Sequence, residues 1–96
     1  MKGKSTYKIP EGKLVKIELD FSGEKINAVK INGDFFMHPE TGVELIERML
    51  KGTMLEKKQI VNAVDVAVKK NSLQLFGITP EGIADAILLA KGASNV

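Results

Sequence analysis

The sequence VKIELDF, residues 15–21, alternates strictly between apolar and charged side chains. Successive side chains of a strand point to opposite faces of a sheet, so the four apolar residues share one face and the three charged residues share the other. This pattern is typical of an antiparallel sheet with one face covered and one face in solvent. It predicts a half-buried strand over residues 15–21.

A hairpin follows directly from this strand. Ser22-Gly23-Glu24 has turn composition, and residues 26–32 continue as a second strand. The alternation of the second strand is interrupted because Ala28 and Val29 are adjacent apolar residues. We therefore expect either a bulge or burial on both faces in this strand.

The chain before the hairpin is rich in lysine. Residues 1–16 carry five lysines and one glutamate, although the whole chain has a net charge of only +2. Residues 1–6 are expected to form a basic N-terminal arm, and residues 7–9 a short edge strand before Pro10, which cannot donate to a ladder. Lysines without arginines or interleaved aromatic residues are a weak signal for nucleic-acid binding, so we interpret the arm as solvated and expect no nucleic-acid partner.

After residue 39 the apolar spacing changes to that of helices. Thr41 and Glu44 form a capping-box pattern, in which the threonine oxygen would accept from a free helix amide. The first helix is expected to end near Gly52. A second helix is expected over residues 57–69, where small and β-branched residues require tertiary packing to hold it.

The third helix has the clearest start signal. Thr79-Pro80-Glu81 combines an N-cap residue, a proline suited to the first helical position and an acid favourable to the helix dipole, and the helix is expected to run to about residue 91. Residues 73–78 form a dense apolar connector, read as a short strand or an extended plug. Strands followed by helices predict an α+β fold: a small antiparallel sheet, made of a hairpin plus an edge strand, covered on one face by about three helices. Residues 7–96 are expected to form one domain.

Composition excludes several classes of function. The chain has no cysteine, so disulfides, thiolate metal sites and cysteine nucleophiles are excluded. Its apolar runs are shorter than the roughly 18 residues that a membrane span needs, and the first residues lack the apolar region of a secretion signal. We expect a cytoplasmic protein with no membrane partner.

Candidate catalytic groups are few. His38 is the only histidine, and none of the four serines lies in a nucleophile turn, so a serine triad is not supported. Gly33 is not followed by further glycines at the spacing of a phosphate-binding loop. Four side chains could be grouped into a metal site: Asp34, His38, Glu40 and Glu44. Their spacing matches no known site, and a single histidine among surface acids is more often a solvated loop residue.

The segment INGDFF, residues 31–36, carries the main candidate surface. Adjacent side chains in extended structure point to opposite sides, so one ring of Phe35 and Phe36 is expected to be buried and the other offered to a loop or a partner. Gly33-Asp34 is either a turn, with glycine in a backbone conformation closed to other residues and aspartate capping nearby amides, or part of the rim of a partner's active site.

Residues 31–36 with Pro39, together with KIPEGKLV at residues 8–15, resemble the small accessory domain of lipoate-protein ligases. The likeness covers residues 7–92. In archaea that domain is often a separate short chain, whereas in many bacterial enzymes a related domain is fused to the C-terminus of the catalytic one.

The resemblance implies that this chain is the accessory subunit of a two-chain lipoate-protein ligase. In that family the catalytic subunit binds lipoate and ATP, makes lipoyl-adenylate with release of pyrophosphate, and passes the lipoyl group to a lysine of an acceptor domain. The small domain is required for adenylation and contributes few or no catalytic side chains. This chain alone is thus expected to bind no cofactor, with lipoate, ATP and Mg in the complex and lipoyl acceptor domains as indirect partners. Whether octanoate replaces lipoate stays open.

No catalytic residue and no metal ligand are expected here. The resemblance identifies six residues as candidates for the partner interface or the rim of the partner's active site: Lys13, Gly33, Asp34, Phe35, Phe36 and His38. Lys13 is otherwise an ordinary lysine at a strand start. The alternatives are a stand-alone small binding or regulatory module for protein or nucleic acid, and a small enzyme with a site on Asp34, His38 and Glu40.

Overall fold

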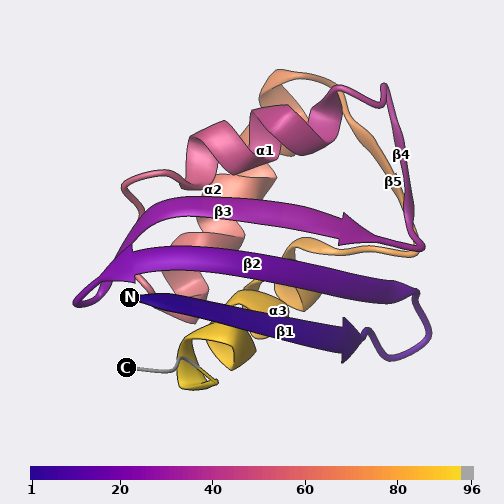
Figure 1. The fold of residues 1–96 in the computed structure, drawn as a ribbon. Coiled ribbons are helices and arrows are strands. Elements are labelled where there is room, and N and C mark those ends of the chain that lie inside the picture. The colour runs from indigo at the N-terminus through magenta and orange to yellow at the C-terminus, as the bar shows by residue number, and fades with distance from the viewer. Residues whose placement is uncertain (94–96) are drawn as a thin grey trace.

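A three-stranded antiparallel sheet forms one layer of the fold, and three helices cover one of its faces (Figure 1). The structure, a computed structural model, describes residues 1–93. The sheet contains β1 (Lys2–Lys8), β2 (Leu14–Ser22) and β3 (Lys25–Gly33), in chain order across the sheet. The predicted α+β class, with helices on one face of a small antiparallel sheet, is confirmed.

The hairpin of β2 and β3 has the predicted alternation and a bulge. Asp20 pairs with Ala28 and Phe21 pairs with Ile26, so Asn27 is the extra residue on β3. The interrupted apolar pattern of this strand therefore reflects a bulge rather than burial on both faces: Ala28 is exposed, and only its neighbour Val29 faces the core.

Strand β1 is longer than predicted. It begins at Lys2, so residues 1–6, expected to form a basic arm, belong largely to the sheet. Gly3 is buried and Ser5 is half-buried on the helix side, and the Ser5 hydroxyl donates to the carbonyl of Ala86 at 2.7 Å. The sequence did not predict a strand over residues 2–6, because the inward positions hold a glycine and a serine in place of large apolar residues.

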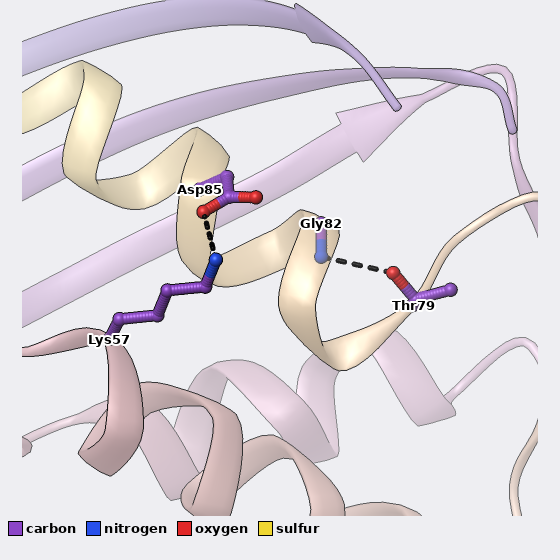
Figure 2. A network of polar contacts seen from close by, with 4 residues as sticks. All are labelled: Lys57, Thr79, Gly82 and Asp85. Atoms are coloured by element: carbon purple, nitrogen blue, oxygen red, sulfur yellow. Dashed lines mark hydrogen bonds and ion pairs between the residues drawn. The ribbon is translucent and has the colours of Figure 1, made fainter. Parts of the chain in front are cut away.

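The helices are α1 (Gly42–Leu50), α2 (Lys57–Lys70) and α3 (Pro80–Gly92). The start of α3 is as predicted: the Gly82 amide donates to the Thr79 hydroxyl oxygen at 3.0 Å (Figure 2). The capping-box prediction for α1 is wrong. Thr41 already has helical backbone angles, φ −63° and ψ −10°, and its side chain caps no amide, because a capping side chain requires extended backbone at that position.

One ion pair joins α2 to α3. Lys57 Nζ lies 3.0 Å from Asp85 Oδ1 (Figure 2). The hydrogen bond to Asp85, followed by the attraction of the carboxylate charge, raises the pKa of Lys57 above its ordinary value. The contact is largely solvent-exposed, so its contribution to stability is small.

The core lies between the sheet and the helices and is mainly aliphatic. Its fully buried large side chains come from β2, β3 and all three helices: Val15, Ile17, Ile26, Ile46, Leu50, Ile60, Val64, Ile83 and Ile87. Alanines 84, 86 and 90 let α3 approach the other elements closely. No helix within residues 1–93 combines the length and the apolar character needed to cross a bilayer.

A separate two-stranded ribbon stands at one end of the sheet (Figure 1). Strand β4 (Phe36–His38) precedes α1, and strand β5 (Gln74–Phe76) follows α2. The two pair antiparallel, with Met37 opposite Leu75. The connector at residues 73–78 therefore contains the short strand that its composition suggested, but its pairing with β4 was not predicted.

Candidate partner interface

Two exposed phenylalanines pair on the outer side of the ribbon. Phe36 and Phe76 are 55% and 52% exposed, and their ring centroids lie 5.9 Å apart with the planes inclined at 49°. Large aromatic side chains of this exposure, gathered in one place, are typical of a surface that a partner covers. His38 and Gln74 are also exposed, and they form the next pair on the same side of the ribbon, two residues along each strand. We call these four residues the ribbon face.

The inner side of the ribbon is fixed to the domain. Met37 is buried, and its sulfur lies close to Gly42 at the start of α1, where an added Cβ would come within 2.8 Å of it. At the other end, the Lys13 amide donates to the Gly77 carbonyl at 2.8 Å. Gly77 has φ +79°, which favours glycine, and the aliphatic stem of Lys13 lies against it. The ribbon face is therefore held on a scaffold attached at both ends.

The two adjacent phenylalanines behave as the sequence predicted. Phe35 is half-buried and contacts the core, whereas Phe36 belongs to the ribbon face. One ring thus anchors the segment and its neighbour faces solvent. This arrangement supports Phe36, rather than Phe35, as the contact residue.

Gly33 has a structural role. Its φ is +153°, and an added Cβ would overlap the Leu14 carbonyl oxygen. That same oxygen accepts from the Asp34 amide at 3.0 Å. The turn interpretation therefore accounts for Gly33 and for the backbone of Asp34, while the Asp34 side chain is exposed. The contact ties β2 to the segment that leads into the ribbon.

Five of the six candidates from the sequence fall into two groups, and the sixth, Asp34, has an exposed side chain in the turn before the ribbon. Phe36 and His38 lie on the ribbon face, and Lys13 lies at its base. Gly33 and Phe35 support the segment from within. Phe76 was not among the predicted interface residues, although the sequence contained a signal for it. Leu73 and Leu75 alternate in the connector, so in extended structure Phe76 points to the opposite side from them. Phe36 is related to Phe35 in the same way.

The rest of the described surface offers little for chemistry. Among residues 1–93, no three histidine, aspartate or glutamate side chains gather where they could hold a metal ion. The proposed grouping of Asp34, His38, Glu40 and Glu44 is therefore not formed. An open hollow of about 690 Å³ lies over the sheet, lined mostly by charged residues such as Lys2, Glu18 and Lys30, and it includes no residue of the ribbon face.

The fold and this surface describe a small α+β domain that carries an exposed pair of aromatic rings on an anchored ribbon. Comparison with known proteins agrees. A family model described as "Bacterial lipoate protein ligase C-terminus" matches residues 4–87. The chain belongs to this family.

A named relative and a solved structure also point to the lipoate-protein ligase family. The chain is 32% identical over 74 residues to lipoate-protein ligase A subunit 2 of Thermoplasma acidophilum, an alignment that covers 77% of this chain and 76% of that protein. It also superimposes with a TM-score of 0.76 and 29% identity on a chain from a structural analysis of an archaeal lipoylation system from the same organism. That superposition covers 91% of this chain and 94% of the other, and the system is described as a bipartite lipoate protein ligase and its E2 lipoyl domain.

Proposed function

We propose that this chain, as the accessory subunit of a two-chain lipoate-protein ligase, docks on the catalytic subunit through the ribbon face and is required there for ATP-dependent activation of lipoate to lipoyl-adenylate. The lipoyl group then passes to a lysine of lipoyl domains. The observation that carries the proposal is the exposed Phe36–Phe76 pair on an anchored ribbon. Because the activation step consumes ATP, the proposal places the complex in the cytoplasm.

The two-chain arrangement is supported by the relatives. One is named as subunit 2 of a lipoate-protein ligase, and the solved structure is described as a bipartite ligase. This chain aligns with most of the length of both, so it corresponds to the small partner. The partner that the ribbon face meets is then the catalytic subunit.

The chemistry of activation is assigned to that subunit. Binding a nucleoside triphosphate with its Mg²⁺ takes backbone amides of a glycine-rich loop, cationic side chains and carboxylate ligands. The described residues of this chain present a single arginine, Arg48, on the surface of α1, and no cluster of carboxylates that could hold a metal ion. These residues offer no site for the metal ion, so the proposal assigns the binding of ATP and Mg²⁺ to the catalytic subunit.

The role left for this chain is to position its partner. An apolar surface on a rigid ribbon can hold the substrate loops of the catalytic subunit in the conformation that brings the lipoate carboxylate to the α-phosphate of ATP. Interactions of this kind raise the rate without a side chain that touches the reacting atoms. Phe36 and Phe76 are therefore contact residues and not catalytic residues.

The test is pyrophosphate release by the catalytic subunit from lipoate and ATP, with and without this chain. We expect no release from this chain alone, slow release from the catalytic subunit alone, and a large increase when the two are mixed. An adenylation rate that does not change on addition of this chain would contradict the proposal.

A further inference from the structure

The two outer edges of the main sheet differ in how their backbone groups are satisfied. Along β3 the edge is closed by the chain itself. The Ile26 amide donates to the Thr53 carbonyl at 2.9 Å, and the Gly52 amide donates to the Ile26 carbonyl at 2.8 Å. Further along, the Ile31 amide donates to the Glu47 carboxylate at 2.8 Å. Little of this edge is left for another strand.

The outer edge of β1 is open. The Phe21 amide donates to the Met1 carbonyl at 2.9 Å, so the odd-numbered residues of this strand exchange hydrogen bonds with β2 and the even-numbered residues direct their backbone groups outward. The outward residues are Lys2, Lys4, Thr6 and Lys8. Among residues 1–93, no backbone or side-chain partner is found for the amides of these four residues, and all four are exposed.

The side chains beside this edge exclude one occupant. Three of the four outward residues are lysines, and within residues 1–93 only Lys4 of these three has an ion-pair partner, a loose contact of 4.0 Å with Glu18. If a second copy of this chain paired antiparallel along β1, lysines would stand opposite lysines or next to them, which destabilises a strand pair. A strand that adds here must bring carboxylates at alternate positions.

The turn after β1 connects this edge to the ribbon. β1 runs toward the end of the sheet at which the ribbon stands (Figure 1), and the turn that follows it is joined to the ribbon by the hydrogen bond from the Lys13 amide to the Gly77 carbonyl. A partner that covers the ribbon face can therefore reach the end of β1 across this turn. We propose that an extended segment of the catalytic subunit, with acidic side chains at every second position, adds to β1 as a fourth strand of the sheet. This inference rests on the proposed function, because it takes the catalytic subunit as the partner.

Amide hydrogen exchange of the full chain, free and bound to the catalytic subunit, tests the inference residue by residue. In the free chain the outward amides of Lys4, Thr6 and Lys8 exchange quickly, whereas the ladder amides of Ser5 and Tyr7 are already protected. In the complex the outward amides are expected to slow by about tenfold or more, since each gains a backbone acceptor. Outward amides that exchange equally fast in the free and bound chain would overturn the inference.

A pair of variants at one position provides a second test. Thr6→Pro removes the outward amide without touching the bonds to β2, because proline is tolerated where the N–H of an edge strand faces solvent. Thr6→Ala removes the side chain and keeps the amide. The proline variant is expected to bind the catalytic subunit about tenfold more weakly than the alanine variant. Equal affinity of the two would contradict strand addition.

Charge reversal at Lys4 provides a third test, which stays informative if the Thr6→Pro variant fails to fold. Lys4→Glu is expected to weaken binding about tenfold at low salt, Lys4→Gln by less, and the gap between them is expected to close in 1 M salt. The absence of such a gap at low salt would exclude an acidic strand. If pyrophosphate release depends on this chain but the β1 amides stay unprotected, the inference fails and the proposed function stands. If no complex forms, both fail.

Discussion

Phe36 and Phe76 contact each other across the β4–β5 ribbon, with ring centroids 5.9 Å apart, although one precedes α1 and the other follows α2. The ribbon thus closes a loop that contains both helices. Because the paired rings come from distant segments, the apolar surface exists only when the helical half of the domain is folded. The docking proposed for this surface is therefore expected to depend on the integrity of α1 and α2.

Removing the rings of Phe36 and Phe76 is expected to weaken docking on the catalytic subunit much more than it destabilises the fold. The double variant Phe36→Ala, Phe76→Ala should lower the free energy of unfolding by only about 1 to 3 kcal/mol, because each ring is half exposed and the two rings contact mainly each other. Its affinity for the catalytic subunit should fall at least about tenfold, as for the central residues of an interface. Calorimetric titration measures the affinity, and urea unfolding measures the stability.

Leu89→Ala is the matched control, since Leu89 is 48% exposed on α3, outside the ribbon. It should leave the affinity within about twofold of the unchanged chain. If the control weakens docking as much as the double variant, the ribbon face is not the interface.

Local patterns predicted the hairpin and the helices, but not the ribbon. Alternation over residues 15–21 and the signal at Thr79 are properties of a few neighbouring residues, and both were correct. The pairing of Phe36 with Phe76 depends on how α1 and α2 fold back on each other. The spacing of apolar residues within a short segment carries no information about this long-range arrangement. The sequence therefore indicated that one adjacent phenylalanine would be exposed, but could not name its partner.

Gly33→Ala is expected to destabilise the domain by roughly 2 to 4 kcal/mol. The substitution places a Cβ against the Leu14 carbonyl oxygen and forces a φ of +153° that other residues rarely adopt. Thermal unfolding measures the loss. A variant that keeps its stability but loses docking would instead assign Gly33 to the partner interface.

The threonines that precede α1 and α3 give different predictions. Thr79→Ala should cost about 1 kcal/mol, because it removes the acceptor of the Gly82 amide at the start of α3. Thr41→Ala should cost less than about 0.5 kcal/mol, since the Thr41 side chain caps no amide of α1. Urea unfolding of the two variants side by side checks the contrast, and equal losses would contradict the finding that Thr79 caps α3 while the Thr41 side chain caps no amide of α1.

The length of β1 and the cap of α1 were wrongly predicted for related reasons. In β1 the inward positions are taken by Gly3 and Ser5, which pack on α3 without an apolar signal. At Thr41 the residue pattern matched a capping box, but the turn from Pro39 to Gly42 had already set helical backbone angles. Packing on α3 thus set the length of β1, and a neighbouring turn overrode the capping motif at Thr41.

The ion pair between Lys57 and Asp85 predicts a pH dependence at the alkaline end. Its hydrogen bond raises the pKa of Lys57 in the folded chain above the unfolded value. The contribution of the pair is therefore fully present below about pH 10.4, the ordinary lysine pKa, and is lost as pH rises through the higher folded value. Asp85→Asn should lower the Tm slightly at pH 7 to 9, and the difference from the unchanged chain should shrink above pH 10.5. A constant difference to pH 12 would contradict this assignment.

We expect this chain to act on the activation of lipoate and to contribute no group to the transfer of the lipoyl residue. Comparing two starting points tests it most directly: lipoate with ATP, and preformed lipoyl-adenylate, each with the catalytic subunit and a lipoyl domain. The account predicts that lipoylation from lipoate and ATP requires this chain, whereas lipoylation from lipoyl-adenylate proceeds at a similar rate without it. An equal requirement for this chain from both starting points would contradict the account.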